Sequence, residues 1–375
     1  MNRLWIRAAA AILMLFSLSC AILAPKAETV SDTGAAAMAL IEAETGCVLA
    51  EQNKDVPLPM ASTTKIMTAL IVLENSDIGE TAATPDEAVG TEGSSIHLAK
   101  NERMSVIDLL YGLMLASGND AAVALAVHTA GSVSAFVDMM NARAAELGLE
   151  KTHFVTPNGL HDREHYTTAY ELCLIAREAL KNETFRTIVS TKYYTASSGD
   201  RPRTFKNKNS LLWTCRGAFG VKTGYTSAAG RCLVFGAERD GMTVIGVVLN
   251  CRPMFETASK LLDAAFEEYT VETIVRAGEA QKPVIIENGA EKLLEVETKH
   301  SIISVMRRSS RKQFRIETVI FEGVSAPVER GETVGELRVY DGCTLVGSTD
   351  LIASRDMRER DFLFWWRLLL PFFAA

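Results

Sequence analysis

The stretch at residues 60–70, MASTTKIMTAL, places a polar cluster directly before an apolar run. The cluster is Ser62-Thr63-Thr64-Lys65, which has the form Ser-x-x-Lys. It suits a helix N-cap, because Ser and Thr often accept the first free backbone N–H of a helix. It equally suits a nucleophile with its base, because residues i and i+3 of a helix are neighbours. The rest of the chain has to distinguish these two interpretations.

Two further short motifs follow along the chain. Ser117-Gly118-Asn119 has the form Ser-x-Asn, and Lys222-Thr223-Gly224 is Lys-Thr-Gly. Either motif alone is weak, since the first is common between helices and the second is an ordinary strand end. The three motifs together, in this order and at these separations, strongly indicate a catalytic site.

The chemistry explains why these residue types would occur together. A serine hydroxyl is a poor nucleophile and needs a base. Lys65 can be that base only if its pKa falls from the usual value of about 10.4. Burial and a second cation nearby, such as Lys222, both lower the pKa of a lysine. Backbone N–H groups form an oxyanion hole, and the amides of Ser62 and Tyr225 are the candidates.

In these motifs the chain resembles the low-molecular-weight penicillin-binding proteins, the serine-type D-Ala-D-Ala carboxypeptidases, for which this motif set is a known signature. The resemblance continues through the stretches GSSIHLAKNERMSVIDLLYGLMLASGNDAAVALA, LGLEKTHFVTPNGLHDREHYTTAYEL, FKNKNSLLW, GVKTGYTSAAG and ERDGMTVIGVVL. It covers nearly the whole chain that follows the predicted signal peptide at residues 1–27. It implies a β-lactamase/transpeptidase-like catalytic domain that removes the terminal D-Ala from peptidoglycan stem pentapeptides. It also implies inhibition by β-lactam antibiotics, with no cofactor and no metal.

The resemblance implies a role for each motif residue. Ser62 would be the acylated nucleophile, Lys65 its general base, and Ser117 the relay of protons to the leaving D-alanine. Lys222 and Thr223 would bind the terminal carboxylate, which cationic donors recognise strongly. Water would then hydrolyse the acyl-enzyme. The implied substrate-binding set is Asn119, which would hydrogen-bond the substrate backbone, with Lys222, Thr223, Gly224 and Tyr225.

Other functions stay open at this point. A class A β-lactamase would carry Ser-Asp-Asn as its middle motif and a loop Glu that activates water. Here the middle motif is Ser-Gly-Asn, and the pattern around Glu164 does not match. A D,D-endopeptidase or transpeptidase of the same fold differs only in what occupies the cleft. A non-catalytic cell-wall scaffold would need a degraded motif, whereas all three are intact.

The order of elements predicts an α+β fold. Strands come first, then many helices, then consecutive strands and a last helix, so an antiparallel sheet is expected to form from both ends of the domain. Strands are expected at residues 35–49 and in VKTGYT, RCLVFGAERDG and MTVIGVVLN. Helices are expected at 62–75, from 104 to Ser117-Gly118-Asn119, and at 120–130, 132–147, 169–180 and 254–268. The predicted divisions are a signal peptide (1–27), a catalytic domain (28–272), a small all-β domain (273–354) and an amphipathic tail (355–375).

The two ends predict export and attachment to a membrane. Arg3 and Arg7 precede the apolar run AAAAILMLFSLSCAILA, which is typical of a secretory signal peptide. A membrane-spanning anchor and a lipoprotein site at Cys20 are alternatives, and the cleavage site stays open. In the tail, aromatic and leucine residues from Phe362 to Phe373 follow helical spacing, with Arg360 and Arg367 on another face. This pattern predicts a peripheral anchor on the outer face of the cytoplasmic membrane; the alternative is a tail packed on the protein.

Charge and metal-ligand spacing narrow the class of partner. The formal net charge of −7 argues against nucleic acid. The seven cysteines have wide, irregular spacings, and which of them pair stays open. His161 and His165 lie four residues apart with Glu164 between them, but the stretch lacks helical periodicity and is expected to be a loop rather than a zinc site.

Overall fold

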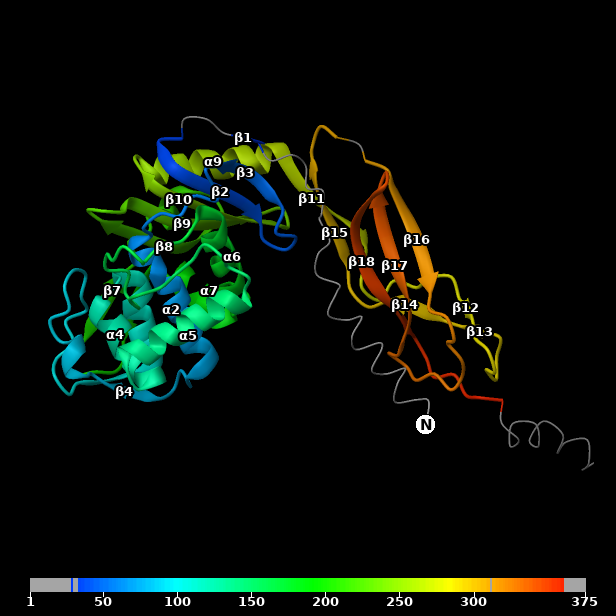
Figure 1. Cartoon of the computed structure of the whole chain (residues 1–375), viewed down its shortest axis with the longest axis horizontal. Coiled ribbons are helices and arrows are strands. Elements are labelled where there is room, and N and C mark those ends of the chain that lie inside the picture. Colours follow the sequence, from blue (N-terminus) through cyan, green and yellow to red (C-terminus); the bar gives the residue numbers. More distant parts are fainter. Residues whose placement is uncertain (1–27, 30–32, 311, 361–375) are drawn as a thin grey trace, which may run out of the picture. The chain divides into compact units, whose positions relative to one another are not determined.

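The computed structural model describes residues 28–29, 33–310 and 312–360 (Figure 1). The chain divides into two compact units, and the division falls between Glu268 and Tyr269. The predicted signal peptide and the tail beyond residue 360 lie outside the described residues. Within the described ranges no single helix has the length and apolarity to cross a membrane, although the bent pair α4 (Asn119–Ala130) and α5 (Val133–Glu146) reaches both criteria together.

The first unit is built on a six-stranded sheet. Its strands are, in spatial order, β1 (Glu28–Thr29), β3 (Val48–Gln52), β2 (Ala35–Glu42), β10 (Met242–Cys251), β9 (Gly230–Arg239) and β8 (Ala218–Thr226). All neighbours are antiparallel except β1 and β3. Strand β2 pairs with β10, with Ala39 opposite Val247, so the sheet joins the two ends of the unit. The α+β fold with an antiparallel sheet is therefore confirmed.

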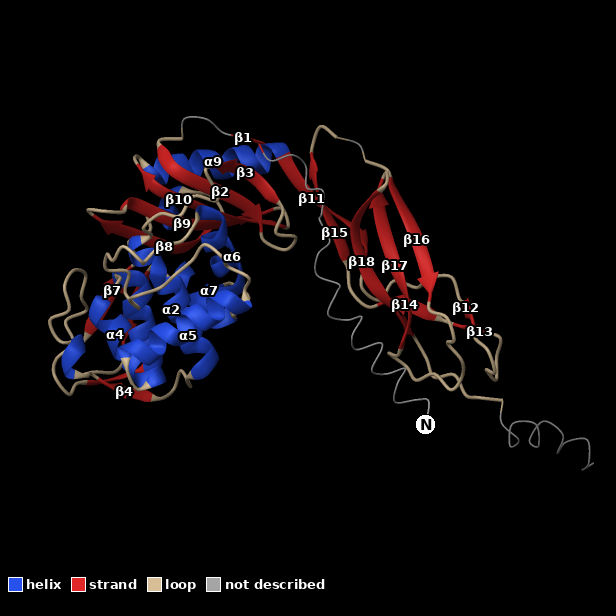
Figure 2. Cartoon of the chain, viewed as in Figure 1, coloured by secondary structure: helices blue, strands red, loops and turns tan. Residues whose placement is uncertain are grey.

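Helices cover both faces of this sheet. Figure 2 shows α9 (Met254–Glu268) on one face and the layer that contains α2 (Lys65–Asn75) on the other. Residues 65–72 of α2 are all buried. A helix that is apolar all round belongs inside a core, and here it carries the Ser-x-x-Lys motif into that core. The other α-helices among the described residues are α3 (Val106–Tyr111), α6 (Ala169–Ala179), α7 (Glu183–Ser190) and α8 (Leu211–Thr214).

Two predicted helices differ from the structure at the motifs. The helix expected from Ser62 starts as a 3₁₀ turn, η2 (Ala61–Thr64), and becomes α-helical only at Lys65. The helix expected to run to Ser117 ends in a π-helical segment, η4 (Gly112–Ala116). Ser117 then adopts a left-handed conformation with φ of 65°. Such irregular segments recur at functional sites, and hydrophobic periodicity cannot distinguish them from an α-helix.

The described residues of the second unit, which begins at Tyr269, are all-β, as predicted. Its four-stranded antiparallel sheet has the order β14 (Val296–Thr298), β18 (Thr344–Ala353), β17 (Thr333–Asp341) and β16 (Phe314–Ile320). Two smaller pairs are β11 (Tyr269–Val275) with β15 (Ile302–Arg307), and β12 (Val284–Ile285) with β13 (Leu293–Leu294). An apolar cluster that includes Leu294, Leu337 and Leu351 forms the core of this unit.

Candidate active site

Ser62 lies in the 3₁₀ turn η2 and does not cap a helix. No side-chain cap hydrogen bond occurs at either η2 or α2. The neighbouring hydroxyls turn inward instead: Thr63 Oγ1 donates to Met60 O and Thr64 Oγ1 to Ala61 O, at 2.6 and 2.8 Å. Ser62 Oγ lies 3.0 Å from Lys65 Nζ and lines an open cavity. Of the two interpretations of this serine, the geometry supports the nucleophile.

Lys65 is fully buried, and its amine contacts three acceptors. Nζ lies 3.0 Å from Ser62 Oγ, 2.7 Å from Asn119 Oδ1 and 2.5 Å from Asn158 O. Burial, and then the positive charges of Lys222 and Lys208, hold the pKa of Lys65 well below its usual value. A neutral amine has two N–H groups and one lone pair. It can donate to Asn119 and Asn158 and accept from the Ser62 hydroxyl, which is the arrangement that a general base requires.

The second motif contributes Ser117 to the same cavity as Ser62. Ser117 is buried, with its side chain at the cavity. Both polar atoms of the Asn119 side chain make hydrogen bonds within the protein: Oδ1 accepts from Lys65 and Nδ2 donates to Glu92 O. The backbone N–H of Asn119 also donates to Ser94 O at 2.7 Å. Asn119 therefore holds the base and the loop at residues 92–94 in a fixed relation.

The third motif lies on β8, directly beside η2. A Cβ added at Gly224 would lie 3.1 Å from Ser62 N and 3.1 Å from Met60 O, so glycine allows this close approach. Thr223 and Gly224 line the cavity, and so does the exposed Tyr225. Lys222 is buried and donates to Thr223 O. Burial, and then the charge of Lys208, lower the pKa of Lys222 to about 7.

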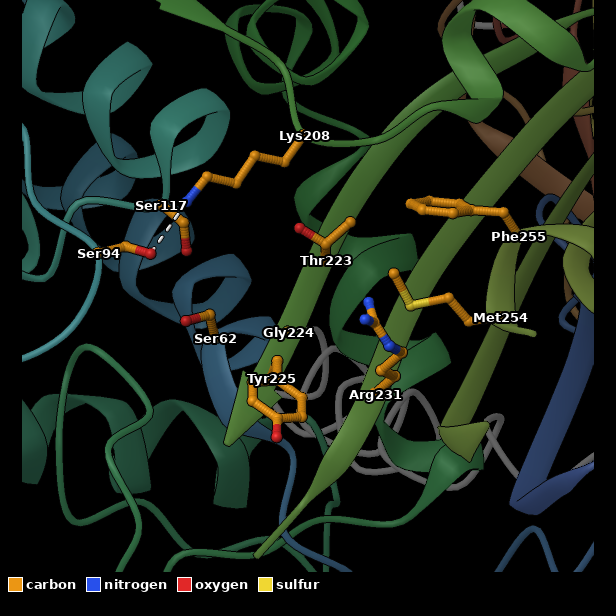
Figure 3. Close-up of a pocket in the computed structure, with 10 residues that line it drawn as sticks. All are labelled: Ser62, Ser94, Ser117, Lys208, Thr223, Gly224, Tyr225, Arg231, Met254 and Phe255. Atoms are coloured by element: carbon orange, nitrogen blue, oxygen red, sulfur yellow. Dashed lines mark hydrogen bonds between the residues drawn. The ribbon is translucent and has the colours of Figure 1, made fainter. Parts of the chain in front are cut away.

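The cavity measures about 300 Å³ and opens to solvent (Figure 3). Five of the eight predicted site residues line it: Ser62, Ser117, Thr223, Gly224 and Tyr225. Of the other three, Lys65 contacts both Ser62 and Asn119, and Lys222 donates to Thr223 O. The remaining lining residues were not predicted. They are Ser94, Lys208, Arg231, Met254 and Phe255.

Lys208 is the most informative of the residues that sequence reasoning missed. Its Nζ lies 2.9 Å from Ser94 Oγ, and Figure 3 shows it reaching across to Ser117. Burial lowers its pKa. Asn158 was missed as well. Its carbonyl reaches Lys65 because the following glycine, with φ of +84°, packs against η2 where a Cβ would lie 2.1 Å from Ala61 O. A loop glycine beside Asn158 was the available signal, but nothing in the spacing links it to Lys65.

His165 supports the turn that carries Ser62, and His161 is not part of that contact. His165 is buried, its Nδ1 accepts the Val155 N–H at 2.9 Å, and its Nε2 lies 2.7 Å from Thr64 Oγ1. Burial lowers the pKa of His165 to about 4, so the ring is neutral at pH 7 and Nε2–H donates to Thr64. Within the described ranges no cluster of three or more His, Cys, Asp or Glu could hold a metal ion.

A buried lysine that contacts a serine beside an open cavity, with Lys208 lining that cavity and Lys222 buried nearby, is the arrangement that a serine acyl-transfer enzyme requires. Residues 24–253 match the family described as D-alanyl-D-alanine carboxypeptidase, and residues 269–359 match the penicillin-binding protein 5 C-terminal domain. The chain therefore belongs to the D-alanyl-D-alanine carboxypeptidase family, as its resemblance predicted. Enzymes of this family act on peptidoglycan peptides.

Individual relatives agree with this assignment along most of the chain. D-alanyl-D-alanine carboxypeptidase DacF of Bacillus subtilis is 34% identical over 334 residues, 86% of either chain. DacD of Escherichia coli is 30% identical over 370 residues, which cover 93% of this chain and 94% of DacD. The crystal structure of penicillin-binding protein 5 from Haemophilus influenzae is 27% identical, with a TM-score of 0.75, and covers 88% of this chain and 100% of that one.

Proposed function

We propose that this chain removes the terminal D-Ala from peptidoglycan stem pentapeptides through an acyl-enzyme on Ser62. The observation that carries the proposal is the contact of 3.0 Å between Ser62 Oγ and the buried amine of Lys65. A lysine with a lowered pKa has a neutral fraction that can take the hydroxyl proton. The family assignment supplies the substrate, a peptide that ends in D-Ala-D-Ala.

Acylation would begin at Ser62, with Lys65 as the base. Ser62 Oγ attacks the carbonyl carbon of the penultimate D-Ala while Lys65 accepts the Oγ proton. The amides of Ser62 and Tyr225 would stabilise the oxyanion, and the close approach of the two backbones at Gly224 supports this role. When the carbon–nitrogen bond breaks, the leaving amine takes a proton through Ser117. Water then attacks the ester, with Lys65 again as the base.

The terminal carboxylate would lie between Thr223 and the lysines. Lys208 lines the cavity and the buried Lys222 donates to Thr223 O, and a free carboxylate is best recognised by cationic donors. The same two charges lower the pKa of Lys65. Substrate binding and activation of the base therefore depend on the same pair of lysines.

Export and membrane attachment complete the proposal. The substrate lies outside the cytoplasm, which agrees with the secretory character of residues 1–27. The amphipathic tail would hold the enzyme on the outer face of the cytoplasmic membrane. Support for both comes from the sequence alone.

The direct test is covalent labelling by penicillin. The purified chain and its Ser62→Ala variant would be mixed with benzylpenicillin and their intact masses measured. We expect a long-lived adduct of penicillin mass on the wild type and none on the variant. Consumption of the drug without an adduct would indicate a β-lactamase. An untouched drug with a folded protein would favour the non-catalytic scaffold.

A further inference from the structure

A second hollow adjoins the active-site cavity, and both are lined by Lys208. It measures about 750 Å³ and is open to solvent. We call it the aromatic groove. Its lining includes Tyr193, Lys206, Lys208, Ser210, Trp213 and Thr214. The proposed removal of D-Ala uses only one of these residues, Lys208, so the rest of the groove has no function in that reaction.

The groove combines exposed aromatic rings with positive charge. Tyr193 is 56% and Trp213 41% exposed, and their ring centroids lie 5.9 Å apart, edge to face. Lys206 Nζ lies 5.8 Å from the Tyr193 ring centroid and 5.6 Å from that of Trp213. Single exposed aromatics are ordinary on protein surfaces. Two rings in contact, beside lysines and next to a catalytic cavity, are more typical of a ligand site.

The groove is held in shape by buried contacts beneath it. Tyr193 and Lys206 belong to the hairpin of β6 (Tyr193–Ala196) and β7 (Arg203–Lys206). The neighbouring Tyr194 donates to Asp108 Oδ1 at 2.6 Å and stacks on Tyr111 at 3.5 Å between centroids. A preformed surface loses little conformational entropy when a ligand binds. The hairpin that carries Tyr193 and Lys206 is therefore anchored before any ligand arrives.

The groove adjoins the active-site cavity at the Lys208 end. In Figure 3, Lys208 and Ser117 lie at one end of the cavity, Tyr225 and Arg231 lie at the other, and Ser62 lies between them. If the substrate carboxylate binds near Thr223 and Lys208, the leaving group occupies the Lys208 end. Whatever extends beyond that leaving group then enters the aromatic groove, because Lys208 lines both hollows.

We propose that the aromatic groove binds the second stem peptide of a cross-linked peptidoglycan dimer. In such a dimer the D-Ala carbonyl is bonded to an amine at the D-centre of a diamino acid, whose own carboxylate takes the place of the D-Ala carboxylate. The rest of the second stem is an anionic peptide, whose carboxylates suit Lys206 and whose aliphatic groups can pack on the ring of Trp213. The inference rests on the proposed function and adds a D,D-endopeptidase substrate to it.

The reaction balances without any further reactant. Ser62 Oγ bonds to the D-Ala carbonyl carbon, the amide bond to the second stem breaks, and the freed amine takes the proton from Ser62. Water then hydrolyses the ester. The acyl part is identical to that of the pentapeptide, so only the leaving group differs between the two substrates.

The test compares these two substrates on the same variants. Purified wild type, Trp213→Ala, Lys206→Gln and the control Lys192→Gln would be assayed with a stem pentapeptide and a purified cross-linked dimer. Lys192 also approaches the Trp213 ring, at 5.8 Å, but does not line the groove. We expect Trp213→Ala and Lys206→Gln each to lower kcat/KM for the dimer about tenfold, the effect of ~1.4 kcal/mol. Their kcat/KM for the pentapeptide, and both values for Lys192→Gln, should stay within about twofold of wild type.

Three results would overturn the inference. They are no cleavage of the dimer by a wild type that cleaves the pentapeptide, equal losses on both substrates, or no loss on the dimer. Failure of the proposed function gives a different result, since the wild type would then leave the pentapeptide uncleaved, whether or not it cleaved the dimer.

Discussion

Asn119 Oδ1 accepts a hydrogen bond of 2.7 Å from Lys65 Nζ, so an uncharged amide occupies the position beside the buried base. A carboxylate of the same shape would favour the ammonium form of the lysine. An amide rather than an acid at residue 119 therefore leaves a larger fraction of Lys65 neutral at pH 7. This relationship leads to the first prediction.

Asn119→Asp should move the pH profile of the enzyme to higher pH. An opposite charge in contact raises the pKa of Lys65, by about 1–3 units for such neighbours. The acidic limb of kcat/KM, which requires neutral Lys65, should shift upward, and activity lost at pH 7 should partly return at pH 9. Profiles of kcat/KM against pH would measure this. Asn119→Leu, which removes the acceptor without adding charge, should lose activity with no such recovery. An unmoved acidic limb in Asn119→Asp would exclude Lys65 as the titrating base.

Gly224→Ala should slow acylation. The added Cβ would lie 3.1 Å from both Ser62 N and Met60 O, so β8 has to move away from η2. Forcing an extra methyl into a packed site costs about 1–3 kcal/mol, and the displaced amides would no longer meet the oxyanion. The acylation rate would be measured by quenched-flow mixing with benzylpenicillin, followed by mass spectrometry of the protein. Gly79→Ala is the control, since its Cβ would meet only the flexible end of the Asp77 side chain, and its rate should equal that of wild type. Equal rates for both variants would contradict the close approach.

Lys222→Met should stabilise the first unit in acid more than in base. The pKa of Lys222 falls from 10.5 to about 7 on folding, so between these values the unfolded chain binds more protons than the folded one. Stability due to this group therefore rises with pH across that window and is lost as pH falls through about 7. Methionine removes the buried charge, so Tm should rise by several degrees at pH 6 and by much less at pH 10.

Scanning calorimetry at the two pH values would measure this difference. Lys260→Met is the matched control, because Lys260 is exposed and pairs only with Glu256 along α9, and its Tm should change little at either pH. A gain for Lys222→Met that is the same at pH 6 and pH 10 would mean that packing, and not charge, is responsible.

Removal of the tail should release the protein from membranes. Its aromatic and arginine residues suit a bilayer interface. We expect the full chain to sediment with vesicles that contain anionic lipid, and a chain ended at Ser354 to remain in the supernatant. Penicillin labelling of Ser62 in both proteins would show that the shortened chain is folded. Equal sedimentation of the two would remove the tail as the anchor.

The sequence by itself determined the residues that carry chemistry and the class of fold. Ser62 and Lys65 lie three residues apart, which one helical turn brings into contact whatever the rest of the fold does. Alternation of apolar residues predicted β2, turn-linked strand patterns predicted β8, β9 and β10, and the helix predicted at residues 254–268 matches α9. These features are local, because side-chain periodicity is set by backbone geometry alone.

Only the tertiary structure decided how the site is completed. Asn158 and Lys208 lie 93 and 143 residues after Lys65, and loops with no periodic pattern deliver them to the cavity. The low pKa of Lys65 likewise depends on burial and on Lys222, which β8 places nearby. Tyr193 and Trp213 are exposed and separated by a hairpin, so no rule of spacing joins them into one groove. Desolvation and convergence of distant segments are properties of the folded chain, and a linear pattern does not record them.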